Sequence, residues 1–242
     1  MNLIENLKIN ENDVITLTGG GGKTSLMMRL GKELSKKRMN HVLTTTAKIC
    51  ISDLPGAQSI ICENINDIID VLKKDSQQEW IIGKEKVTDQ KISGFAEEEL
   101  VILKNAIKPL IIINEGDGSK RKPYKFYGDY EPMIPQITTK LIHVIGAEVL
   151  YKKIDNKTFH RSELYGDTQA IFDEDVLFQA LKDFIKNKLD AKLAGDTQRI
   201  LFINKADGEN LENARIMSKI GAPLFDRCLM GSLQEDWIET VK

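Results

Sequence analysis

Short apolar runs alternate along this chain with longer stretches whose apolar residues recur every three or four positions. The short runs have the length of strands, and several are apolar throughout, as is typical of strands that helices cover on both faces. The longer stretches have the spacing of amphipathic helices. The expected strands span residues 14–17, 41–45, 58–62, 79–83, 109–114, 140–146 and 199–204. The expected helices span residues 25–37, 65–74, 96–106, 174–189 and 210–221.

This alternation of strands and helices predicts an α/β fold with three layers, in which a mostly parallel sheet has helices on both faces. We expect one domain over residues 1–242. Two stretches without clear periodicity, at about 115–139 and 148–168, interrupt the pattern and are expected to be irregular insertions. Loops of such length in compact domains tend to be functional or disordered.

The composition excludes several classes of protein. The 242 residues have a formal net charge of −2, which argues against broad nucleic-acid binding because that requires a basic face. Three scattered cysteines, Cys50, Cys62 and Cys228, form neither a zinc motif nor a disulfide framework. The polar N-terminus does not resemble a signal peptide, and no apolar run approaches the roughly 20 residues that span a bilayer. We therefore expect a protein of the reducing cytoplasm, without a membrane or nucleic-acid partner.

A run of glycines separates the first expected strand from the first expected helix. The run and the polar residues that follow it are Gly19, Gly20, Gly21, Gly22, Lys23, Thr24 and Ser25. Strand, glycine turn, Lys-Thr and helix is the order of a phosphate-binding loop, because bare backbone amides can turn around an anion at the positive end of a helix. Lys23 would then contact the β- and γ-phosphates, and the Thr24 hydroxyl would ligate Mg²⁺.

The loop is two residues shorter than the usual pattern, in which a glycine would occupy the position of Leu17. It is similar to the shortened loops of the Mur-type peptide ligases. The alternative is a glycine-rich turn that precedes a lysine by chance. Because strand and helix flank the loop as the motif requires, we favour a P-loop-type fold that binds a nucleoside triphosphate.

Two acidic residues, Glu115 and Asp117, follow the buried-looking strand at 109–114. Ligands of open α/β sheets bind at the carboxyl ends of strands, where a carboxylate can hold Mg²⁺ opposite the Thr24 hydroxyl. We favour Asp117 for the metal and consider that Glu115 could instead orient an attacking water. The alternative for both is an ordinary turn at the end of a strand.

The strand at 199–204 ends in Asn204, Lys205, Ala206 and Asp207, the order of the guanine-recognition element of GTPases. An aspartate accepts hydrogen bonds from N1–H and the 2-amino group of guanine, which adenine lacks, so it discriminates between the two bases. The alternative is that Asp207 caps the following helix. The sequence leaves the choice between GTP and ATP open.

Other polar residues are weaker candidates. Lys120 and Lys125 follow the acidic strand end and, with His160 and Arg161, could hold an anionic second substrate, although a solvated basic loop explains them equally well. The threonines at 44–46 could contact Mg²⁺ or the γ-phosphate. We expect the cysteines to be core residues.

Taken together, these segments resemble one known family. Its motifs occur here in order as VITLTGGGGKTSLMMRLGKEL, VLTTTAKI, IINEGDGSKRKPYK, YEPMIP, TFHRSEL and FINKAD. From Val14 to about Gly231 the chain is similar to the selenium-dependent hydroxylase accessory proteins, the YqeC-like family. The resemblance implies a P-loop-type nucleotide-binding protein that helps to mature selenium-dependent molybdenum hydroxylases, with such an enzyme or its cofactor as a partner. Arg121, Lys122 and Tyr124 depart from the small or apolar residues usual in the family at these positions.

The function expected from the residues and the resemblance is Mg²⁺-dependent binding and hydrolysis of GTP or ATP, with Lys23, Glu115 and Asp117 as catalytic candidates. Two alternatives remain. One is a nucleotide-gated chaperone or scaffold without significant turnover. The other is a small-molecule kinase or ATP-dependent ligase, which the shortened loop and the basic stretch at 119–125 would suit.

Overall fold

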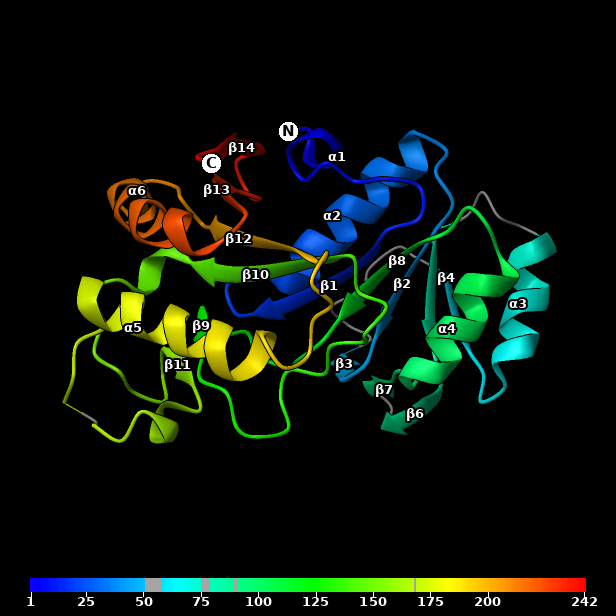
Figure 1. Ribbon diagram of the computed structural model, residues 1–242, viewed down its shortest axis with the longest axis horizontal. Coiled ribbons are helices and arrows are strands. Elements are labelled where there is room, and N and C mark those ends of the chain that lie inside the picture. Colours follow the sequence, from blue (N-terminus) through cyan, green and yellow to red (C-terminus); the bar gives the residue numbers. More distant parts are fainter. Residues whose placement is uncertain (51–57, 75–78, 89–90, 168) are drawn as a thin grey trace.

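The computed structural model describes residues 1–50, 58–74, 79–88, 91–167 and 169–242. In this part of the chain the main sheet has nine strands in the order β14-β13-β12-β10-β1-β8-β2-β5-β4, and all neighbours pair in parallel except β13 and β14 (Figure 1). The strands are β1 (Val14–Gly19), β2 (His41–Thr45), β4 (Gln58–Ile61), β5 (Trp80–Gly83), β8 (Ile111–Glu115), β10 (Lys140–Gly146), β12 (Gln198–Asn204), β13 (Arg227–Ser232) and β14 (Trp237–Thr240).

Helices cover both faces of this sheet. Alternate residues of β1 show the division, because Ile15 and Leu17 pack with α1 and α2 whereas Val14 packs with α3 and α4. The helices α5 and α6 pack against Leu201 and Ile203 of β12, at the other end of the sheet (Figure 1). Leu201 aligns through His143 with Thr18, which shares a face of β1 with Val14, so α5 and α6 cover the same face as α3 and α4. The helices of the described ranges are α1 (Leu3–Asn6), α2 (Lys23–Lys36), α3 (Ile65–Lys74), α4 (Glu97–Ala106), α5 (Glu174–Phe184) and α6 (Asn210–Gly221).

The α/β fold and the mostly parallel sheet expected from the sequence are confirmed. All seven expected strands and all five expected helices are present, with ends that differ by at most two residues except at α5, which stops at Phe184 and continues as a π-helical turn (Ile185–Leu189). The sequence analysis missed β13 and β14. The apolar core of β13 is only three residues long, Cys228 to Met230, and β14 is a half-exposed edge strand.

The two irregular stretches pack against each other. The first contains β9 (Tyr124–Lys125) and the second contains β11 (Phe159–His160), and these two strands pair in parallel. Aromatic rings join them, with 5.9 Å between the ring centroids of Tyr124 and Phe159. A separate small sheet consists of β3 (Lys48–Cys50), β7 (Lys91–Ser93) and β6 (Glu85–Thr88).

Cys228 is a core residue, as expected. Burial raises the pKa of its thiol to about 12, so it stays protonated. Cys62 is half-buried, and the side chain of Cys50 lies outside the described residues. Within those residues, none of the helices combines the length and the apolarity that a bilayer crossing requires.

His143 of β10 lies buried between the sheet and α5. Its Nδ1 is 3.1 Å from the Thr18 hydroxyl, and its ring stacks on Phe184 with 4.1 Å between centroids. Burial lowers the pKa of this imidazole to about 3, an effect that the charge of Asp117 partly opposes. The folded protein therefore holds His143 neutral over most of the acidic range.

This imidazole makes the stability of the fold dependent on pH. An unfolded histidine takes up a proton at about pH 6.5, whereas folded His143 does not until about pH 3. The free energy of unfolding should therefore fall as the pH drops below about 6.5, by about 3 kcal/mol from this residue at pH 4. Urea unfolding at pH 7 and pH 4 measures the loss, and the His143→Phe variant should lose correspondingly less. Equal losses in the two proteins would contradict the assignment.

Candidate functional site

The strand order brings distant segments together at one edge of the sheet. In the register of the central strands Leu17 lies beside Glu115, and Gly19 lies beside Val144. Across β10 and β12, Gly146 lies beside Asn204. The glycine turn, the acidic strand end and the Asn-Lys-Ala-Asp segment therefore meet at the carboxyl edge, as ligand-binding segments of open α/β sheets do.

The glycine turn is packed tightly against its neighbours. Gly22 precedes α2 with a φ of 119°, a left-handed conformation that disfavours any residue with a side chain. A Cβ on Gly21 would lie 2.2 Å from the backbone nitrogen of Gly146, and one on Gly22 would lie 2.6 Å from Nδ2 of Asn204. Glycine is therefore needed here for close approach as well as for the turn.

The first three amides of the turn are engaged within the protein. The Gly19 amide donates to Asp117 Oδ2 (3.0 Å), the Gly20 amide to the Val144 carbonyl (2.9 Å) and the Gly21 amide to the Lys122 carbonyl (3.0 Å). These three amides therefore donate to protein groups in this structure. The first amides of α2 remain, because they have no acceptor within the helix. Thr24 is half-buried and Ser25 is exposed, so solvent reaches this first turn.

Lys23 begins α2 and turns its ammonium inward. Its Nζ lies 2.9 Å from Asp117 Oδ1 and 3.8 Å from Glu115 Oε1, and it donates to the Gly19 carbonyl at 2.5 Å. All three charged side chains are buried. Such a cluster persists only when the charges are paired, because an unpaired buried charge is costly.

The charges of this cluster control each other's protonation. Burial by itself would lower the pKa of Lys23, but Asp117 and Glu115 hold that pKa above its usual value. Burial would likewise raise the pKa of Asp117, but Lys23 and Lys125 hold that pKa below its usual value. Lys23 and Asp117 are therefore both charged at neutral pH.

Thr24 lies beside this cluster. Its hydroxyl donates to Glu115 Oε2 at 2.9 Å, so a hydroxyl oxygen and a carboxylate oxygen meet at the first turn of α2. Glu115, at the end of β8, thus contacts the side chain that the sequence analysis assigned to a metal, whereas Asp117 contacts Lys23 and the Gly19 amide. The sequence could not separate the roles of the two acids because only two positions divide them.

Asn204 links two loops. Its Nδ2 donates to the Gly21 carbonyl (2.7 Å), and its Oδ1 accepts from the Leu233 amide (3.1 Å). Lys205 forms an ion pair with Glu148. The carboxylate of Asp207 accepts from the Ser232 hydroxyl at 2.7 Å.

The alternative role of Asp207 as a helix cap is wrong, because α6 begins at Asn210 with Glu209 at the N-cap. Sequence reasoning missed Ser232 and Glu148. Neither residue lies in a recognisable motif. For Ser232, the sequence offers one indication, which is its position at the end of an apolar run that forms a strand.

The threonines at the end of β2 and directly after it donate to backbone carbonyls. The Thr44 hydroxyl donates to the Ile82 carbonyl (3.1 Å), and the Thr45 hydroxyl donates to the Glu115 carbonyl (2.8 Å). Thr46 donates to the Met133 carbonyl at 2.8 Å. These bonds hold β2 beside the acidic strand end and the loop after it.

The four basic candidates for a second substrate are neighbours in space. Lys125 pairs with His160 in the register of β9 and β11. Burial lowers the pKa of His160, and the nearby charges of Lys125, Lys120 and Arg161 lower it further. Glu131, which the sequence analysis did not single out, balances part of this charge, because its Oε2 lies 2.8 Å from Lys125 Nζ and 3.1 Å from Arg161 Nη2.

The fold and this edge together define an α/β protein whose central parallel strands carry a glycine turn, two buried acids and a bridging asparagine at their carboxyl ends. The sequence profile described as YqeC protein matches residues 15–163, and the chain belongs to this family. It is also 26% identical over 229 residues to the "Uncharacterized protein YqeC" of Escherichia coli (strain K12), which covers 92% of this chain and 88% of that protein.

The two hydrogen bonds of Asn204 lead to a prediction about stability. Replacing Asn204 with alanine leaves the Gly21 carbonyl and the Leu233 amide without their partner in a buried place. We expect the free energy of unfolding to fall by about 2–4 kcal/mol, as measured by urea denaturation at pH 7.

Asn213→Ala is the matched control, because Asn213 makes one long bond, at 3.4 Å, to the Ala147 carbonyl. This variant should lose less than about 1 kcal/mol. Equal small losses in both variants would show that Asn204 does not tie the loops together.

Proposed function

We propose that this protein binds a purine nucleoside triphosphate with Mg²⁺ at the first turn of α2 and hydrolyses its terminal phosphoanhydride bond. The observation that carries the proposal is the contact of the Thr24 hydroxyl with Glu115 at 2.9 Å, beside the buried Lys23. A P-loop nucleoside triphosphatase needs these three groups together at the start of a helix that follows a glycine turn.

The residues present suit Mg²⁺. A hydroxyl and a carboxylate are hard oxygen ligands, and the Thr24 hydroxyl and Glu115 Oε2 lie 2.9 Å apart. Among the described residues, no group of three or more His, Cys, Asp or Glu side chains forms a metal site. This accords with Mg²⁺, which is typically held by one or two carboxylates, phosphate oxygens and water. When bound, the ion would neutralise charge that develops on the phosphates.

The side chains divide the work in this proposal. Thr24 and Glu115 hold the ion, which revises our sequence-based preference for Asp117. Asp117 positions Lys23 through the 2.9 Å ion pair and fixes the turn through the Gly19 amide. Lys23 neutralises the terminal phosphates, and the free amides of α2 bind their oxygens.

Asp207 selects the base in this proposal. Its carboxylate is half-buried and oriented by Ser232, and its neighbour Asn204 bonds directly to the glycine turn. This link keeps the base-recognition segment at a fixed distance from the phosphate end. A carboxylate in that position favours guanine, because adenine offers no N1–H or 2-amino donor.

The cluster of Lys120, Lys125, His160 and Arg161 favours a second candidate, phosphoryl transfer to an anionic acceptor. It lies next to the acidic strand end, since Lys125 donates to the Gly118 carbonyl at 2.7 Å. The proposed role in maturing selenium-dependent molybdenum hydroxylases is supported by the family resemblance alone.

The first test replaces Thr24. In thermal-shift measurements with Mg²⁺, a nucleotide at a hundredfold excess over its dissociation constant should stabilise the wild type by about 2.7 kcal/mol. Thr24→Ala should weaken Mg²⁺-dependent binding and slow hydrolysis at least about tenfold, because the hydroxyl ligand is lost.

The Ser35→Ala variant is the control, since it removes a hydroxyl from the far end of the same helix. It should bind and hydrolyse nucleotide as the wild type does. A wild-type protein that neither GTP nor ATP stabilises would overturn the proposal, and tight binding without turnover would favour the scaffold.

The second test addresses the base. Asp207→Ala should weaken GTP binding by about a hundredfold and leave ATP binding unchanged, since only guanine loses hydrogen bonds. Glu209→Ala removes an equal charge from an exposed position two residues away and should change neither affinity. Titration calorimetry with both nucleotides gives the affinities. Equal effects of Asp207→Ala on GTP and ATP would refute selection of guanine.

A further inference from the structure

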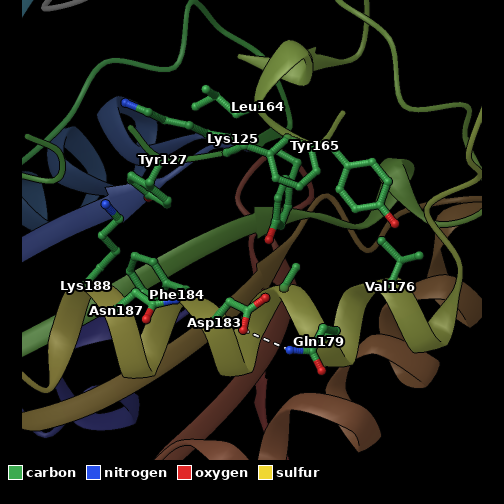
Figure 2. A pocket seen from close by; sticks show the side chains of 13 residues that line it. Lys125, Tyr127, Leu164, Tyr165, Val176, Gln179, Asp183, Phe184, Asn187 and Lys188 are labelled. Carbon is green, nitrogen blue, oxygen red and sulfur yellow. Dashed lines mark hydrogen bonds between the residues drawn. The ribbon is translucent and has the colours of Figure 1, made fainter. Parts of the chain in front are cut away.

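A groove of about 370 Å³ lies between α5 and β9, on the face of the sheet opposite α2 (Figure 2). None of its lining residues belongs to the glycine turn or to the segment 204–207. Its volume is in the range of small-molecule sites, which are mostly apolar with a few placed polar groups. The proposed hydrolysis of nucleotides does not use it.

One wall of the groove is aromatic. Tyr124, Phe126 and Tyr165 form it, with 5.3 Å between the ring centroids of Tyr124 and Phe126 and 5.4 Å between those of Phe126 and Tyr165. Further rings behind them belong to the core that joins β9 and β11, so this wall is held in place. Such a wall favours a flat, apolar body that can stack on rings.

The opposite wall is a polar stripe of α5. Gln179 and Asp183 lie four residues apart and therefore share one side of α5, and Asn187 follows in the π-helical turn after it. Figure 2 shows Asp183 on the helix below the aromatic rings, with the Gln179 amide turned along the helix toward it. Gln179 Nε2 donates to one carboxylate oxygen of Asp183 at 2.8 Å. Burial raises the pKa of the Tyr124 hydroxyl well above its usual value, and the negative charge of Asp183 raises that pKa further. Hydrogen-bond acceptors thus face rings across an open space.

One end of the groove is closed by basic side chains. Lys188 donates to the Gly128 carbonyl at 2.7 Å, and Lys125 is fixed by the Gly118 carbonyl and Glu131. The rings of Tyr127 and Phe184, 4.9 Å apart between centroids, lie at the same end. Lys125 is paired with Glu131 and its side chain is buried, whereas Lys188 bonds to a neutral carbonyl and keeps its charge. This end of the groove is therefore positive, and the exposed Asp183 carboxylate supplies a negative charge on the α5 wall.

We propose that this groove binds a planar heteroaromatic molecule that stacks on Phe126 and Tyr165 and donates N–H groups to Asp183. A purely aliphatic ligand could not donate to the Asp183 carboxylate, which can accept hydrogen bonds besides the one from Gln179. The flat body matches the aromatic wall, and the N–H edge matches the acceptors of α5. This second site stands independently of the proposed nucleotide site.

The test uses 2-aminopurine as the probe, with purine as the matched compound that lacks the exocyclic amine. Titration calorimetry or ligand-observed NMR measures the affinities in the full chain. The wild type should bind 2-aminopurine at least about tenfold more tightly than purine. Asp183→Ala should abolish this preference. Alanine has a high helix propensity, so this substitution at an exposed position should leave the helix intact.

Three variants separate the possible outcomes. Asp175→Ala removes the same charge from α5 outside the groove and should change nothing. Ala180→Trp fills the groove and should abolish binding, with circular dichroism to verify that the variant is folded. Asp207→Ala should leave 2-aminopurine binding unchanged; if it abolishes binding while Ala180→Trp does not, the probe occupies the proposed nucleotide site and the inference fails. Absence of binding to the wild type, or equal affinity for purine, also overturns it.

Discussion

The structure of the carboxyl edge depends on the burial of the Lys23 ammonium between Glu115 and Asp117. Taking charges out of water costs several kcal/mol for each ion, and only close pairing and further hydrogen bonds offset that cost. Here the Gly19 carbonyl and the Gly19 amide supply those bonds on the lysine and aspartate sides. The pairing therefore fixes three elements at once: the end of β1, the start of α2 and the loop after β8. Removing one of these charges would destabilise all three elements, because the remaining charges would lose their partners.

Much of the fold could be predicted from the sequence, because hydrophobic periodicity reports directly which residues a sheet must bury. The run at 140–146 matches β10 from end to end. Candidates for the site could be named from the sequence where a motif carries its own chemistry, as with Lys23 and Thr24. The arrangement of these side chains could not be predicted where it depends on the direction in which a side chain points. Glu115 and Asp117 have the same chemistry two positions apart, and only the twist of the chain after β8 directs one to Thr24 and the other to Lys23.

The glycine run shows a further limit of sequence reasoning. Glycine was expected because amides must approach an anion, but three of these amides approach other protein segments instead. The Gly20 and Gly21 positions are filled from outside by the Lys122 carbonyl and by β10, which leave no room for a Cβ. A run of glycines indicates that side chains are not tolerated at these positions. It does not indicate which group packs against the backbone there. In the proposed site, phosphate oxygens would therefore bind at the first turn of α2, where helix geometry leaves amides without an acceptor within the helix.

One segment connects this edge to the groove on the other side of the fold. Asp117 is held by the Gly19 amide and by Lys23, and one residue later the Gly118 carbonyl accepts from Lys125, which belongs to β9 and to the groove wall. The pKa of Lys125 falls with burial, and the charge of Asp117 opposes that fall, so the two side chains also interact through space. The chain between residues 117 and 125 is therefore pinned at both ends, by the proposed nucleotide edge and by the groove. A buried charge tolerates little displacement from its partner. A shift of β9 would therefore move Asp117 and, through the ion pair, alter the position of Lys23.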